Sequence, residues 1–160
     1  MARLTAYAGA TLTVTLKEDL TIDGRDYGGL QEMSIASITD VTRRIVTVTT
    51  TEAVIATFAA AVGPGAYIAA DVMYMRFTNI DDTNFITLTF RNQDNDEVAI
   101  KLDAGKSFFL CGDNSGGMVD IFNATQDADA ASDTGLGDLT NIQADANSAS
   151  VDLEMYIACK

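Results

Sequence analysis

The sequence predicts an all-β protein: an antiparallel two-sheet sandwich, jelly-roll-like, with a long surface loop rich in Ala, Asp and Ser. Segments in which every second residue is apolar run through most of the 160 residues, as expected of strands with one buried face. Clusters of Gly, Asn and Asp separate them at intervals of about 8 to 12 residues, a spacing typical of sandwiches and barrels. We therefore expect about eight to ten strands in a single domain that spans residues 1–160.

The first elements are predicted from alternation and turn chemistry. Residues 11–17 (TLTVTLK) alternate threonine with leucine and valine, which predicts a first strand. Residues 1–10 are mostly small and polar, and we expect them to form an N-terminal arm that reaches an adjacent subunit. The dipeptide Asp23-Gly24 predicts a short hairpin. Two further strands are expected from their apolar and β-branched residues: 31–38 and 43–51.

Residues 52–62 (EAVIATFAAAV) fit two structures. The alanines permit a helix of about three turns, which the glycines on either side of Pro64 would end. The β-branched and aromatic residues within the first part of the segment suit a strand equally well. We predict a strand over residues 53–58, followed by a loop.

Residues 72–111 are predicted to form a meander of four consecutive antiparallel strands. Met73, Met75 and Phe77 are expected in the core, whereas Arg76 lies on the opposite face and can pair with an acid on a neighbouring strand or subunit. Asn and Asp side chains hydrogen-bond to nearby backbone, and Gly adopts positive φ at no steric cost. The residues predicted to shape the turns are Asn79, Asp81, Asp82, Asn84 and Gly105.

The C-terminal part contains the least apolar region of the chain. Residues 118–122 predict a short strand, and residues 150–159 a final strand with one apolar face. Between them, residues 123–147 are rich in Ala, Asp, Asn, Ser and Gly, a composition that buries little. We therefore predict a long surface loop over residues 123–147.

The net charge and the composition exclude several classes of function. The net charge is −13, from 23 acids and 10 bases, and such a chain repels nucleic acid and anionic membranes. The absence of histidine removes His-activated nucleophiles and His-ligated zinc. We see no secretory signal and no apolar run long enough to span a bilayer, so we expect synthesis in a cytoplasm. Overall we expect a protein that is not an enzyme and needs no cofactor.

Two groups of residues are candidate sites, one for calcium and one for a disulfide. The acids Asp94, Asp96, Asp127 and Asp129 are weak calcium candidates, since no twelve-residue calcium loop surrounds them, and we predict solvated turn residues and no metal site. Cys111 and Cys159 lie in separate apolar runs. We predict buried thiols, with a disulfide between them as the alternative.

Residues 74–86 and 101–109 carry a family resemblance. A strand that ends in Asn, a short Asp/Thr/Asn turn and an apolar strand precede a hairpin with the pattern L-x-A-G-x-S. This arrangement resembles small all-β virion proteins of tailed bacteriophages, capsid decoration (cement) proteins in particular. The resemblance covers about 40 residues closely and residues 11–122 loosely, while residues 123–147 depart from it.

The resemblance implies a structural virion protein on the outer surface of the capsid. Its partners would be the major capsid protein and further copies of itself, as a homotrimer. Two alternatives remain open: a phage tail or neck component, and a ligand- or calcium-binding adhesive β-sandwich module.

Overall fold

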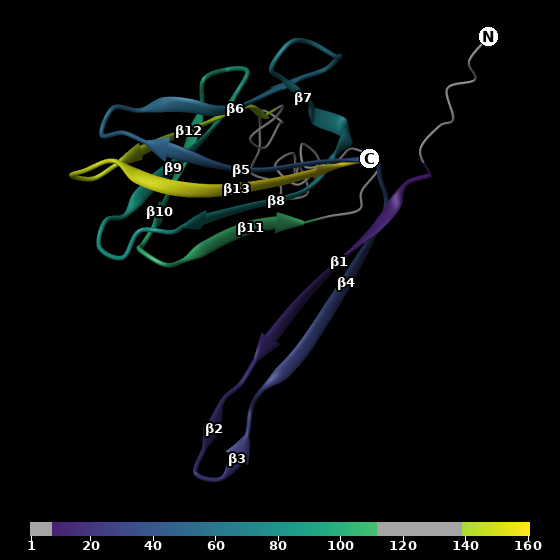
Figure 1. Cartoon of the computed structure of the whole chain (residues 1–160), viewed down its shortest axis with the longest axis vertical. Coiled ribbons are helices and arrows are strands. Elements are labelled where there is room, and N and C mark those ends of the chain that lie inside the picture. The colour runs from purple at the N-terminus through teal and green to yellow at the C-terminus, as the bar shows by residue number, and fades with distance from the viewer. Residues whose placement is uncertain (1–7, 112–138) are drawn as a thin grey trace, which may run out of the picture.

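The computed structural model describes residues 8–111 and 139–160, which form an all-β protein (Figure 1). Two sheets pack against each other as a sandwich, and a two-stranded ribbon runs away from it. The described residues contain one helical element, the short 3-10 helix η1 (Ala69–Asp71). No helix in this part of the chain is long and apolar enough to cross a membrane. The predicted fold class is confirmed.

Thirteen strands occur in the described part of the chain. Their bounds are β1 (Ala10–Glu18), β2 (Thr21–Ile22), β3 (Arg25–Asp26), β4 (Gly29–Ile38), β5 (Asp40–Val48), β6 (Ala53–Ala59), β7 (Tyr67–Ile68), β8 (Val72–Asn79), β9 (Ile86–Asn92), β10 (Glu97–Leu102), β11 (Ser107–Cys111), β12 (Leu139–Ala146) and β13 (Val151–Cys159). The ambiguous segment after residue 52 is the strand β6, as predicted, because its Ile55, Ala56 and Phe58 are buried in the core.

The sandwich has jelly-roll connectivity. One sheet has the order β10-β9-β12-β6-β7 and the other the order β11-β8-β13-β5. The antiparallel pairs are nested along the chain: β5 with β13, β6 with β12, β8 with β11, and β9 with β10. A long hairpin rolled across two sheets gives this nesting, which defines the eight-stranded jelly roll. The short β7 adds a parallel strand beside β6.

The expected meander over residues 72–111 is wrong in its pairing. All four strands exist, but β8 and β11 lie in one sheet while β9 and β10 lie in the other. Alternation predicts that one face of a strand is buried and says nothing of which strand lies beside it. Here the turn after β8 and the turn after β10 each lead from one sheet to the other.

The predicted surface loop over residues 123–147 is also corrected. Its last part is β12, which lies between β9 and β6 inside the five-stranded sheet. Ile142, Ala144 and Ala146 point into the core. Residues 123–138 and the predicted strand over residues 118–122 lie outside the described residues.

The core lies between the inner faces of the two sheets. Phe90 on β9 contacts two aromatic side chains of the opposite sheet, with ring centroids 6.5 Å from Phe77 and 5.8 Å from Phe108. Met75 belongs to this core as predicted, but Met73 packs in a smaller cluster on the other side of its sheet. An irregular register between β8 and β13, at Ala158/Cys159, accompanies this change of side.

The turn that follows β8 is built by the side chain of Asn79, which is fully buried. Its amide nitrogen donates to the carbonyls of Asn84 (2.8 Å) and Leu102 (3.1 Å), and its amide oxygen accepts from the Asp81 N–H. The Asp81 carboxylate in turn accepts the N–H groups of Thr83 and Asn84. The remaining predicted turn residues behave similarly: Asp82 accepts the Thr83 hydroxyl, and Gly105 has a φ of +68°.

We predict that Asn79→Ala lowers the free energy of unfolding by roughly 2–4 kcal/mol, because it leaves the buried Leu102 carbonyl and other turn groups without partners. Urea denaturation measures this loss. The control is Asp82→Ala in the same exposed turn, with an expected change below about 0.5 kcal/mol. Equal effects of the two variants would contradict the role given to Asn79.

A second prediction concerns pH. Hydrogen bonds from the backbone of Asn84 and Thr83 hold the pKa of the Asp81 carboxyl below its usual value. A carboxyl with a lowered folded-state pKa stabilises the protein above its unfolded pKa, and that stability is lost in the acidic range as the pH falls through the folded pKa. Asp81→Asn should therefore show a smaller drop in urea midpoint over this range than the parent. A drop equal to the parent's would contradict this role of Asp81.

Candidate interaction surface

Strands β1 to β4 form one continuous hairpin. The paired residues keep a constant register, from Leu12↔Ile35 near the sandwich to Ile22↔Arg25 at the tip. Asp23 and Gly24 close it with φ values of 50° and 74°, the positive values that a two-residue type I′ turn requires. The predicted hairpin is confirmed, but it is far longer than expected.

One face of the hairpin is mostly apolar. Side chains of directly paired residues point to the same side, and residues two apart in a strand share a face. The shared register therefore places the following apolar residues on one face, with Glu18, Arg25 and Gln31 interspersed among them: Leu12, Val14, Leu16, Leu20, Ile22, Tyr27, Met33 and Ile35. The opposite face carries mostly polar residues, among them Thr13, Thr15, Thr21 and Glu32.

The base of the hairpin is anchored to the sandwich. Ile35 is 3% exposed and Ile38 is 6% exposed, packed with Tyr74 and Ala158 on the outer face of the four-stranded sheet. Leu12 and Val14 add to the same cluster. At this end a register shift between Ala10 and Leu12 gives β4 an extra residue, and Ser37 adopts a φ of 63°. Such a bulge bends a strand, and it lies just before the chain enters β5.

The tip of the hairpin has no such cover from the described part of the chain. Beyond Val14 the apolar face continues with Leu20 (51% exposed), Ile22 (52%) and Tyr27 (57%). Figure 1 shows β2 and β3 far from the sandwich. Leu16 and Ile22 are six residues apart, so the uncovered apolar face extends for about 20 Å.

The outer face of the four-stranded sheet forms three cross-strand rows. In the first row, Ala158, Tyr74 and Cys111 lie beneath the hairpin base, and Val41 is exposed at the end of the row. The next row holds Arg43, Tyr156, Arg76 and Phe109, and the third holds Ile45, Glu154, Thr78 and Ser107. Ile45 is 63% exposed, and Phe109 is also exposed. Beyond the hairpin base this sheet therefore presents apolar side chains to solvent.

Two arginines on this face share one carboxylate. Arg43 Nε donates to Glu154 Oε1 at 2.6 Å, and Arg76 Nη2 donates to Oε2 at 2.9 Å. Arg76 thus pairs with an acid of the neighbouring strand, as predicted. Its guanidinium also lies 5.8 Å from the ring centroid of Tyr156. With two arginines around one glutamate, this row carries positive charge in a chain whose net charge is −13.

A groove of about 290 Å³ separates the hairpin base from this row. Its walls are Leu12 and Val14 on one side and Tyr74 and Tyr156 on the other, with Arg76 also lining it. Thr13 and Thr15 also line it, so the groove combines apolar side chains and hydroxyl groups with one positive charge. It can accept an apolar side chain together with a nearby acidic group.

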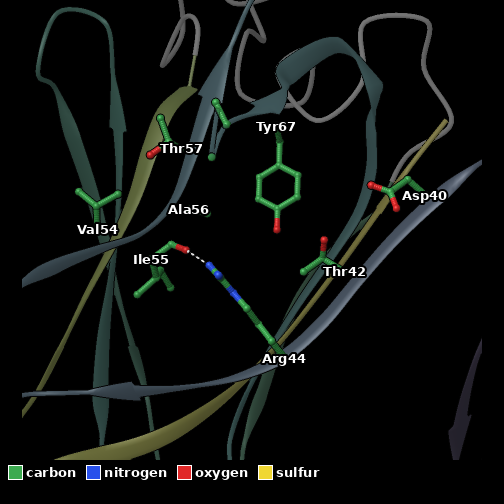
Figure 2. Close-up of a pocket in the computed structure, with 10 residues that line it drawn as sticks. Asp40, Thr42, Arg44, Val54, Ile55, Ala56, Thr57 and Tyr67 are labelled. Carbon is green, nitrogen blue, oxygen red and sulfur yellow. Dashed lines mark hydrogen bonds between the residues drawn. The ribbon is translucent and has the colours of Figure 1, made fainter. Parts of the chain in front are cut away.

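A larger groove, of about 490 Å³, lies at the open edge of the sandwich between β5 and the β6–β7 pair. Figure 2 shows Asp40, Thr42 and Arg44 of β5 facing it, with Tyr67 opposite. Arg44 Nη2 donates to the Ile55 carbonyl at 2.7 Å and so ties the edges of the two sheets together. Polar atoms predominate in the lining, in contrast with the groove at the hairpin base.

Asp94 and Asp96, the calcium candidates among the described residues, take part in the hydrogen bonds of a turn. The N–H groups of Asp94 and Asp96 donate to Asn92 Oδ1, and Asp96 Oδ2 accepts from the Asn92 amide. No cluster of three metal-binding side chains occurs among residues 8–111 and 139–160. Asp127 and Asp129 lie outside the described residues.

The two cysteines are free thiols. Cys159 is buried, and burial, followed by the nearby Asp40 and Asp71, raises its pKa to about 11. Cys111 is half-buried beneath the hairpin, where its thiol contacts Met33 Sδ at 3.5 Å and burial raises its pKa. The structure therefore agrees with the predicted thiols, although Cys111 is only half-buried.

The sequence contained a signal for the hairpin that the prediction did not use. The apolar alternation of residues 11–17 resumes after Glu18 with Leu20 and Ile22. A chain that folds back on itself at Asp23-Gly24 pairs its residues in the observed register. No comparable sequence pattern predicts the cross-strand rows on the outer face of the four-stranded sheet, because these rows depend on which strands become neighbours.

Comparisons with known proteins give little further information. No family model matches the sequence, and no curated protein matches it significantly. Among solved structures, a protein of the disulfide-linked pili that form Bacillus endospore appendages aligns with a TM-score of 0.40 and 11% identity, over 100% of this chain and 98% of that one. A similarity at this level supports no argument about function.

We predict that the two ends of the apolar face differ in their effect on stability. Ile35→Ala should lower the free energy of unfolding by about 2–4 kcal/mol, since it leaves a cavity in the anchor. Leu16→Ala, on the same face but 43% exposed, should cost less than about 1 kcal/mol. Urea denaturation of both variants checks this, and similar losses would show that the anchor is not where the hairpin is held.

Proposed function

We propose that this chain is a structural protein of a virus particle, a capsid decoration protein that stabilises a tailed-phage head from outside. The observation that supports an assembly role best is the hairpin β1–β4, which carries an apolar face about 20 Å past its anchor. Apolar surface presented on a projecting element is typical of protein–protein contacts. A sandwich that carries such an arm is suited to clamp neighbouring subunits.

The finer assignment rests on the resemblance of residues 74–86 and 101–109 to virion proteins of tailed phages. In this proposal the partners are the major capsid protein and two further copies of the chain, arranged as a homotrimer. The net charge of −13 suits the outer surface of the shell, away from the packaged genome, because acidic proteins are repelled by phosphate.

The groove of Figure 2 favours a second candidate, a ligand-binding adhesive module. It holds about 490 Å³ and combines Asp40, Thr42, Arg44 and Tyr67. Anything that binds the native state alone raises the melting temperature. A panel of monosaccharides and calcium in a thermal-shift assay would therefore support the adhesive module if one of them raised the melting temperature, and would count against it otherwise.

The decoration role is tested by co-expressing the chain with the major capsid protein of the same genome. We expect the chain to sediment with the assembled shells. Shells that form without bound chain would overturn the decoration role. Rings or stacked tubes of the chain alone, without shell binding, would favour the tail component instead.

A further inference from the structure

We propose that the tip of the hairpin packs on a second copy of this chain, in the groove between that copy's hairpin base and the Arg43–Tyr156–Arg76–Phe109 row. This inference specifies a partner for the proposed assembly role and rests on that role, but it does not depend on attachment to a shell.

The first argument is continuity with a packing that already exists. The base of the apolar face is buried on the outer face of the four-stranded sheet, against Tyr74 and Ala158. The groove and the exposed Phe109 lie beside that contact on the same sheet face, and the exposed Ile45 lies one row further along that face. A second hairpin tip placed there would extend the same kind of contact from within one chain to between two chains.

The second argument is complementarity of chemistry. The tip presents Leu20, Ile22 and Tyr27 on one face, together with Arg25. The groove is lined by aromatic and aliphatic side chains together with Thr13, Thr15 and Arg76. Residues 16–31 carry four acids and two bases. The receiving row carries two arginines around a single glutamate, so it is among the few described surfaces that would attract an acidic tip in this acidic protein.

The third argument is size. A stable interface uses about 20–30 residues on each side. The tip, residues 16–31, supplies 16 residues, so one contact alone would be small. Each copy can, however, both donate its own tip and accept a neighbour's, because tip and groove lie on different parts of the chain. Such head-to-tail contacts close into rings when the rotation between copies allows it, as in the proposed homotrimer.

Light scattering on a sizing column, over a dilution series of the full chain, tests the donor side. We expect the parent to form a closed assembly. Ile22→Asp should weaken it at least about tenfold, because the variant places a charge in an apolar contact. Thr21→Asp is the matched control: it adds the same charge one residue away, on the opposite face, and should leave the assembly intact.

The acceptor side has its own pair of variants. Ile45→Asp should weaken assembly as Ile22→Asp does, whereas Val98→Asp, an exposed position on β10 in the other sheet, should not. Circular dichroism of each variant confirms that it folds; all four positions are exposed, so their substitution leaves the core unchanged. Chains carrying Ile22→Cys and Ile45→Cys, with different tags, should be joined to each other by a short bis-maleimide, and a Thr21→Cys partner should not.

The outcomes separate this inference from the proposed function. A monomeric parent, or an assembly unchanged by both Ile22→Asp and Ile45→Asp, overturns the inference. If that parent still binds shells and Ile22→Asp abolishes the binding, the tip contacts the shell protein and the decoration role stands. If the chain assembles through its tips but never binds shells, the inference stands and the decoration role fails.

Discussion

The rest of the structure depends on the contact between the inner faces of two strand pairs, β8–β13 in one sheet and β9–β12 in the other. Phe90 sits between Phe77 and Phe108 of the opposite sheet, and the aliphatic residues around them are fully buried. Each strand of these pairs has a neighbour on both sides, so burial of its inner face fixes which side of the sheet meets water. The nested pairing that makes the jelly roll follows from this single packed layer.

That packing also determines where the hairpin is held. With the inner face of β8 and β13 committed to the core, Tyr74, Tyr156 and Ala158 are left on the outer face, too apolar to remain exposed. The hairpin base covers them with Ile35 and Ile38. The cover ends at Tyr156, and Arg43 and Phe109 in the same row stay exposed.

The sequence predicted the strands well and their arrangement poorly. Alternation located β8 to β11 and the turn chemistry of Asn79 and Asp81, because these signals are local. It missed β12, since Ala144 and Ala146 are buried there as small residues beneath larger neighbours, and alanine is equally common in loops. Pairings such as β5 with β13 join residues about 100 positions apart, which periodicity does not encode. The sequence shows which hairpin residues share an apolar face. It does not show which of them are exposed to solvent, because that depends on where the sandwich ends.

The exposed tip has no explanation in the folding of a single chain. A two-stranded ribbon is marginally stable alone in water, and Leu20, Ile22 and Tyr27 are far from the core they would otherwise support. A polar tip with the same Asp23-Gly24 turn would fold at least as well and would aggregate less. Copies that each carry a charge of −13 also repel one another, so any association between them must come from apolar contact and local charge pairing. The tip and the arginine row are the described surfaces that supply both, which is why an assembly role explains the hairpin and a solitary sandwich does not.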